Sequence, residues 1–109
     1  MLETQEVKMT AFQRSVYDLC SQIPSGKVST YKEIAHALGL SGHGYRAVGM
    51  ALNKNPFAPA VPCHRVVSSD GSLGGFAYGC EKKVEMLASE GVIVKNNQVV
   101  DFSLRLHRF

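Results

Sequence analysis

The segment from residue 30 to residue 52 constrains the fold most, because it contains start and stop signals for two short helices. Thr30 and Glu33 have the T-x-x-E spacing of a capping box, which satisfies free amides at the start of a helix. Gly39 follows the apolar positions of that helix, as is typical of a glycine just past a helix end. After a glycine-rich turn, residues 45–52 are predicted to form the second helix. This pair predicts a helix-turn-helix, although a plain helical hairpin in a small core has the same pattern.

The second helix of this pair carries unusually small side chains. Ala47, Gly49 and Ala51 leave a thin surface that can approach a partner closely. Helices that read the major groove usually carry long polar side chains, so we expect DNA binding that is independent of sequence. The charge distribution agrees, since residues 27–69 hold five basic residues and one acidic residue, a balance of +4 against +3 for the whole chain. An ordinary solvated surface is the alternative explanation of this imbalance.

The rest of the chain adds two helices and a small hairpin. An amphipathic helix is predicted at residues 12–23, with Thr10 as its N-cap. Residues 92–100 have the pattern of a hairpin, with a turn of asparagines that can adopt positive φ. Residues 81–90 are predicted to form a last helix, whose inward side chains are Val84, Leu87 and Ala88. We therefore expect a single domain over residues 1–109, mostly α-helical with a small β element.

Composition narrows the class of protein. With 109 residues, of which 45% are hydrophobic, the chain can form one small packed core. No apolar run approaches the roughly 18 residues that span a bilayer, and the N-terminus lacks the pattern of a signal peptide. Cys20, Cys63 and Cys80 show no C-x-x-C or zinc-finger spacing. We therefore expect free thiols and no metal, in a reducing compartment: the cytoplasm or the nucleoid, or the nucleus of a eukaryote. Nothing in the sequence suggests an oligomer, so we expect a monomer.

A cysteine directly followed by a histidine, Cys63-His64, lies between two apolar segments and after Pro62. Proline holds the backbone angle φ near about −65°, so the next residue is presented in a defined way. A nucleophilic cysteine needs a low pKa and a base that takes its proton. Neighbours in sequence do not face each other in a helix or strand, so a turn or a relay water must bring the two groups together. A buried cysteine beside a core histidine is the alternative interpretation.

Five motifs along the chain occur in one order and spacing: Thr30-Tyr31, Y-R-A-V-G at 45–49, Asn55-Pro56, P-C-H-R-V at 62–66, and Lys83 with Glu90. The set resembles the O6-alkylguanine-DNA alkyltransferases, also called methylated-DNA–protein-cysteine methyltransferases, from about residue 12 to about residue 90. The resemblance implies the winged-helix-like, helix-turn-helix DNA-binding domain at the C-terminus of these proteins. Family members commonly carry a separate N-terminal domain, which houses a metal site in some of them. Almost nothing precedes the first helix here, so we expect neither that domain nor a metal.

The resemblance implies a reaction at Cys63. An alkyl group moves from guanine O6 to the sulfur, and the thioether has no easy leaving step, so each molecule reacts once and needs no cofactor. In the family, the histidine that matches His64 takes the thiol proton through a water, and the glutamate that matches Glu90 orients the imidazole. Asn55 matches an asparagine that braces the active-site turn and the helix-turn-helix. Tyr31 matches a tyrosine that crowds the flanking phosphate and then faces the flipped base, where its hydroxyl can donate.

The same resemblance implies how the partner, double-stranded DNA, is bound. A base inside a duplex cannot be reached by a thiol, so the alkylated guanine is flipped out. Arg46 matches the arginine that fills the vacated stack, while the helix lies in the minor groove without sequence preference. The other DNA-contacting residues that it implies are Thr30, Tyr31, Ala47, Gly49 and Ala51. The residues that it implies for the substrate pocket are Val66, Phe76 and Ala77. Many relatives have tyrosine and serine at the last two positions, so no side-chain hydrogen bond from that loop to O6 is expected here, while backbone amides can still donate.

Two other functions fit parts of this sequence. An alkyltransferase-like protein binds and flips alkylated guanine without transferring the group. Such proteins replace the cysteine, usually with tryptophan, so Cys63 favours the enzyme. A small helix-turn-helix regulator would instead bind one duplex sequence and would be indifferent to alkylation of Cys63.

Overall fold

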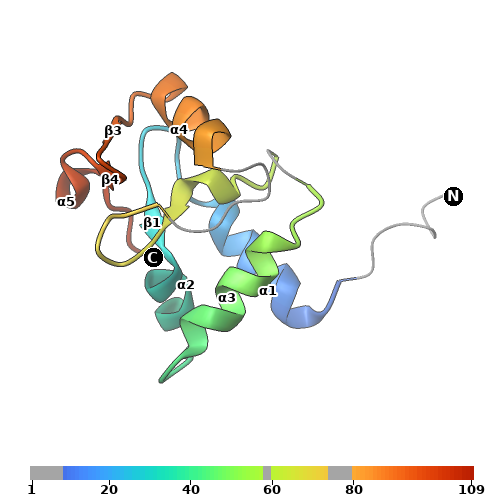
Figure 1. Cartoon of the computed structure of the whole chain (residues 1–109). Coiled ribbons are helices and arrows are strands. Elements are labelled where there is room, and N and C mark those ends of the chain that lie inside the picture. Colours follow the sequence, from blue (N-terminus) through green and yellow to red (C-terminus); the bar gives the residue numbers. More distant parts are fainter. Residues whose placement is uncertain (1–8, 58–59, 74–79) are drawn as a thin grey trace, which may run out of the picture.

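The computed structural model describes residues 9–57, 60–73 and 80–109 (Figure 1). Most of the regular structure is helical, as predicted. The helices are α1 (Ala11–Ser21), α2 (Tyr31–Ala37), α3 (Gly44–Asn53), α4 (Cys80–Ser89) and α5 (Phe102–Arg105), with a short 3-10 helix η2 (Cys63–Arg65). The strands are β1 (Ser29–Thr30), β2 (Val66–Val67), β3 (Val94–Lys95) and β4 (Gln98–Val99). Within the described ranges, no helix is long and apolar enough to cross a membrane.

Two threonines begin the first two helices, as predicted. The Thr10 hydroxyl accepts from the Gln13 amide at 3.0 Å, and the Gln13 side chain accepts from the Thr10 amide at 3.0 Å. This reciprocal pair is a complete capping box at the start of α1. The Thr30 hydroxyl accepts from the Glu33 amide at 2.9 Å and caps α2, while the Glu33 carboxylate lies 3.7 Å from Arg108 Nε. Both N-cap predictions are therefore confirmed.

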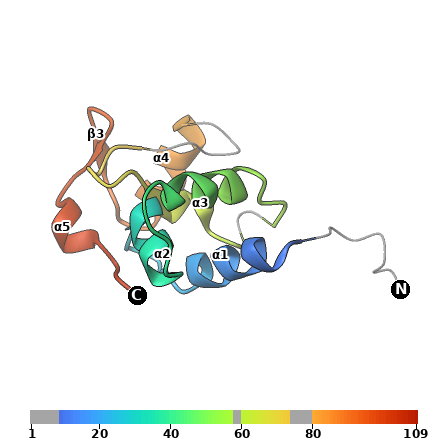
Figure 2. The same cartoon turned by 90° about the horizontal axis from the view of Figure 1, so that it is seen from below.

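The predicted helix-turn-helix is formed by α2 and α3. Gly39, just beyond the end of α2, has a φ of +75°, the left-handed conformation that glycine adopts at least cost. Gly44 begins α3 for a different reason, because an added Cβ would lie 2.5 Å from the Cβ of Leu40. The absence of a side chain therefore lets the turn pack tightly onto α3. This helix then lies across α1 and α2 (Figure 2).

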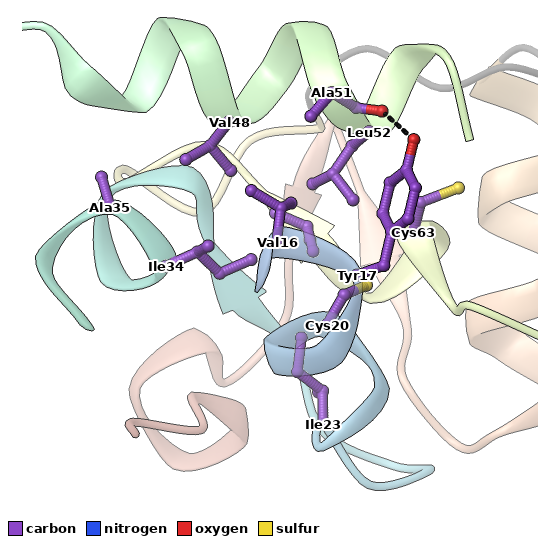
Figure 3. Packing of buried hydrophobic residues seen from close by; sticks show 11 residues of the cluster. Val16, Tyr17, Cys20, Ile23, Ile34, Ala35, Val48, Ala51, Leu52 and Cys63 are labelled. Atoms are coloured by element: carbon purple, nitrogen blue, oxygen red, sulfur yellow. Dashed lines mark hydrogen bonds between the residues drawn. The ribbon is translucent and has the colours of Figure 1, made fainter. Parts of the chain in front are cut away.

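Two clusters of buried side chains hold the domain together. The larger lies between α1, α2, α3 and the η2 turn, and Figure 3 shows eleven of its residues. It includes Val16 and Val48, which are fully buried, and also Cys63. The smaller cluster joins α4 to the β3–β4 hairpin through buried residues that include Leu87 and Val99. Val66 belongs to the larger cluster and its neighbour Val67 to the smaller one, so the two clusters meet directly after the η2 turn.

A short parallel pair of strands lies where the two clusters meet. Ser29 of β1 pairs with Val66 of β2, and Thr30 pairs with Val67. Because β1 leads directly into α2 and β2 directly follows η2, this register brings the start of the helix-turn-helix beside the cysteine-containing turn. The C-terminal segment adds to the same edge, since the Val28 amide donates to Arg105 O at 2.9 Å.

The last helix differs from the prediction in the side chains that it buries. Helix α4 places Leu87 in the core, as expected, and Val84 is half-buried. Ala88 is exposed, however, so its predicted inward position is wrong, and Lys83 is fully buried instead. Leu87 and Lys83 are four residues apart and so share one face of the helix, which turns Ala88 outward. The hairpin prediction is confirmed, with positive φ at both asparagines of its turn.

Candidate active site

Cys63 lies at the start of η2, directly after Pro62. Its amide donates to Val61 O at 2.8 Å, which fixes the turn from within. Only 3% of the residue is exposed, and it packs in the larger core cluster beside Tyr17 (Figure 3). Burial raises the pKa of the Cys63 thiol, while Asn55 and the charge of Lys83 act in the opposite direction. The free protein therefore holds this cysteine as a protonated thiol that needs a base to become a nucleophile.

Asn55 connects the end of α3 to the cysteine-containing turn. Its side-chain amide donates to Val61 O at 2.9 Å, and its Oδ1 accepts from the Phe57 amide at 2.9 Å. The residue is 7% exposed, so these bonds form away from bulk water. Asn55, two residues after the end of α3, is therefore hydrogen-bonded to the segment that leads into the cysteine-containing turn, and its bracing role stays a prediction.

His64 and Glu90 meet although 26 positions separate them in the sequence. His64 Nε2 lies 3.0 Å from Glu90 Oε2, and the two side chains are 3% and 15% exposed. Glu90 is the first residue after α4, where the chain turns back toward η2. A carboxylate at Nε2 favours the tautomer with its proton on that nitrogen, which leaves Nδ1 as the ring nitrogen that can accept one. The arrangement is that of a base with its orienting group.

Arg65 fixes the same carboxylate from the other side. Arg65 Nε donates to Glu90 Oε1 at 2.9 Å, and Arg65 Nη2 donates to Glu90 Oε2 at 2.7 Å. Its Nη1 also donates to Ile23 O at 2.7 Å, which ties the group to the segment after α1. Such a two-bond arginine–carboxylate pair holds the carboxylate in one plane. Arg65 therefore holds Glu90, and Glu90 in turn holds the ring of His64.

The pKa values of His64 and Glu90 are both lower than usual. Burial lowers the pKa of His64, and Glu90 only partly offsets that effect. Burial alone would raise the pKa of Glu90, but hydrogen bonds from Arg65 and His64 outweigh it and the pKa lies below its usual range. At neutral pH the carboxylate is therefore charged and the imidazole is neutral, which is the state that a proton-accepting base requires.

Lys83 is a charged residue at full burial, with none of its surface exposed. Its ammonium donates to Val66 O at 2.6 Å, directly after the η2 turn. Its charge acts to lower the pKa of Cys63, as noted above. A buried ammonium is costly unless its hydrogen bonds are satisfied, and the positive charge of Lys83 favours the ionised form of the Cys63 thiol.

The family of this chain follows from comparison with known proteins. Residues 11–92 match the family described as 6-O-methylguanine DNA methyltransferase, DNA binding domain. The chain belongs to this family. The match covers α1 through the region of Glu90, and so includes every element of the site just described.

Comparison with individual proteins and solved structures gives the same assignment. A methylated-DNA–protein-cysteine methyltransferase of Methanosarcina barkeri is 46% identical over 93 residues, which cover 82% of this chain and 58% of that protein. A structure from S. pombe, in complex with damaged DNA that contains O6-carboxymethylguanine, matches with a TM-score of 0.80 and 30% identity over 94% of this chain and 100% of that one. A Mycobacterium tuberculosis structure in complex with DNA matches with a TM-score of 0.73 and 40% identity, over 79% of this chain and 52% of that one. The chain spans little more than half the length of the curated relatives it matches.

The residues predicted to contact DNA fall into two groups. Arg46 and Ala47 are exposed on α3, and Tyr31 and Gly49 are half-buried neighbours, since a Cβ added at Gly49 would lie 3.9 Å from the Tyr31 ring. A cavity of about 190 Å³ opens beside Tyr31, between the start of α2 and the segment after β2.

The other predicted contacts, Thr30 and Ala51, are buried. Thr30 is 3% exposed and uses its hydroxyl to cap α2. Ala51 is 4% exposed, and its carbonyl accepts from the Tyr17 hydroxyl at 2.8 Å (Figure 3). Each side chain faces the interior of the free protein, and contact of Thr30 and Ala51 with DNA stays a prediction.

The predicted pocket residues are only partly described. Val66 is fully buried in the same cluster as Cys63. Phe76 and Ala77 lie outside the described residues. Sequence reasoning did not include Arg65 or Lys83 among the site residues, although Arg65 stands within the P-C-H-R-V motif and Lys83 within the family resemblance. The signal for Lys83 was its place one helical turn before Leu87, on the side of α4 that faces the core.

Proposed function

We propose that this chain repairs double-stranded DNA by moving the alkyl group of O6-alkylguanine irreversibly to Cys63. The observation that carries the proposal is the chain of contacts from Cys63-His64 to Glu90 and Arg65, in a family whose relatives are methylated-DNA–protein-cysteine methyltransferases. The buried thiol and the neutral base belong to the η2 turn, and the charged group of Glu90 reaches His64 from the end of α4. Those are the groups that a displacement by sulfur requires.

In the proposed reaction, the thiol proton of Cys63 passes through a water to His64 Nδ1. Glu90 stabilises the resulting imidazolium, because its carboxylate lies 3.0 Å from Nε2. The thiolate then attacks the alkyl carbon in line with the bond to O6. A sulfur–carbon bond forms, the carbon–oxygen bond breaks, and guanine leaves as its anion. The anion takes up one proton from water, and the His64 imidazolium returns one proton to the solvent. Tyr31 is proposed to donate from its hydroxyl to the departing base, while Lys83 supports the negative charge on sulfur before the attack.

Access to the base requires that the nucleotide leave the stack. We propose that α3 enters the minor groove, with Arg46 filling the gap and with Ala47 and Gly49 allowing the close approach. Val66, with Phe76 and Ala77, is proposed to form the base pocket. Each molecule reacts once as a monomer and needs no cofactor. A reducing compartment such as the cytoplasm suits the proposal, because the reactive thiol has to stay free.

A second candidate is a protein that binds and flips the lesion without accepting the alkyl group. The observation that favours it is the TM-score of 0.80 with the S. pombe structure on damaged DNA, which this chain matches over that protein's whole length. Cys63 favours the transfer reaction instead.

Intact-protein mass spectrometry separates the two candidates. The protein is incubated with a duplex that contains one O6-methylguanine, beside a Cys63→Ala control. A gain of one methyl group on the Cys63 peptide, absent in the control, supports the transfer. Tighter binding to the lesion duplex without a mass change supports the second candidate. If the folded protein shows neither a mass gain nor tighter binding to the lesion duplex, both candidate functions are contradicted.

A further inference from the structure

Helix α3 has one buried side and one exposed side. Val48 and Leu52 face the core formed with α1 and α2. On the other side, Arg46, Met50 and Lys54 are all exposed, each four residues after the one before. Residues four apart lie on the same face of a helix, so Arg46 and Met50 form a row along α3, and Lys54 follows as the C-cap residue of the helix.

Met50 is the apolar member of this row. It is 61% exposed, and it lines a hollow of about 220 Å³ between α3 and the start of α1, together with Ala47 and Lys54. A single exposed apolar side chain is ordinary on a protein surface and needs no explanation by itself. The position of Met50 is informative, because it stands between two basic residues on the helix proposed to bind DNA.

The width of the DNA groove makes a long side chain at this position consequential. The minor groove is about 6 Å wide, whereas a helix with its side chains is about 10–12 Å across. Close approach is therefore possible only where side chains are small, as at Ala47 and Gly49. A methionine on such a face either occupies the groove or holds the helix away from it. Proteins that bind the minor groove use apolar side chains, methionine among them, in the first way.

We propose that Met50 packs into the minor groove, one helical turn beyond Arg46, against sugars and base edges beside the vacated stack. Four helical residues rise about 6 Å, so Met50 lies farther along the duplex than Arg46 and does not compete for the same gap. Its thioether is unbranched and flexible, which suits a surface that contacts any sequence. This inference rests on the proposed function, because it assumes that α3 is the DNA-contacting helix.

The test compares duplex affinities of four proteins: the wild type, Met50→Ala, Met50→Leu and the control Leu104→Ala. Leu104 is a matched control, since it is an apolar residue of α5 that is 72% exposed. Fluorescence anisotropy gives Kd for an O6-methylguanine duplex and for the undamaged duplex at several salt concentrations. We expect Met50→Ala to weaken both on the order of tenfold, as for an apolar side chain that no longer leaves water. Met50→Leu should stay within about twofold and Leu104→Ala should match the wild type.

Two readouts identify the apolar contact. The slope of log Kd against log salt should be the same for Met50→Ala and wild type, because no phosphate contact is removed. Methyl transfer from the free O6-methylguanine nucleoside, which involves no groove, should also be unchanged. Equal or tighter duplex binding by Met50→Ala would overturn the inference and identify Met50 as an obstacle. Failure of the proposed function looks different, since the wild type itself would then neither prefer the lesion duplex nor accept a methyl group.

Discussion

Replacing Glu90 with glutamine tests the central feature of the proposed mechanism, because it removes one charge and keeps the size of the side chain. Glu90 Oε2 lies 3.0 Å from His64 Nε2, and the two side chains are 15% and 3% exposed. At an effective dielectric constant of about 20, a unit charge pair at this distance attracts by about 5 kcal/mol. Arg65 shares the same carboxylate and offsets part of that attraction toward an imidazolium.

We therefore expect a loss of about 2–3 kcal/mol from the step that forms the imidazolium, which is a rate decrease of roughly 30- to 150-fold. Glu90 also raises the pKa of His64 against the lowering effect of burial. In Glu90→Gln that pKa should fall further, so the acid limb of the pH–rate profile should move to lower pH while its maximum drops. A purely structural role of Glu90 would lower the amount of active protein without moving this limb.

The assay is the single-turnover rate of methyl transfer from an O6-methylguanine duplex at saturating DNA. The rate is measured at evenly spaced pH values from about pH 5 to about pH 9, a range that includes the usual pKa of histidine. Glu85→Gln is the matched control, because Glu85 lies on the same helix α4 and its side chain is 73% exposed. Urea unfolding checks that each variant is folded. If folded Glu90→Gln reacts within about threefold of the wild type and its acid limb does not move, the proposed role of the carboxylate is refuted.

Three further predictions follow from the structure. Lys83→Met removes a buried positive charge near Cys63, so the pH–rate profile should shift to higher pH and the rate at pH 7 should fall at least about tenfold; an unshifted profile contradicts the proposed role. Burial raises the pKa of Cys63, so its contribution to stability is complete below the unfolded-state pKa of about 8.5 and is lost as the pH rises. The urea midpoint of the wild type should thus fall more between about pH 8 and about pH 10 than that of Cys63→Ala. An equal fall of the urea midpoint in both proteins would contradict this contribution of Cys63. Gly44→Ala should destabilise the fold by about 1–3 kcal/mol in the same assay, since its Cβ would lie 2.5 Å from that of Leu40. Gly49→Ala, with its nearest contact at 3.9 Å, should not destabilise it.

Helix boundaries were predictable because their signals are local. Thr10 and Thr30 were recognisable as N-caps, and Gly39 as the residue after a helix end, from neighbours within four positions. Helix α3 was found to within one residue at each end. Its orientation was harder to predict, because small and apolar residues occur around the whole helix. Periodicity alone did not show that Ala47 faces outward and Ala51 faces the core.

The helix-turn-helix, the cysteine–histidine pair and the family resemblance were predictable without the fold, because each depends on residues close together in the chain or on a motif. Which distant groups meet those residues depends on how the elements pack against one another. The parallel pairing of Ser29 with Val66, the two bonds from Arg65 to Glu90 and the burial of Lys83 all join positions that local signals leave independent. Burial and charge then set the protonation of Cys63 and His64, since both act through the surroundings that folding assembles.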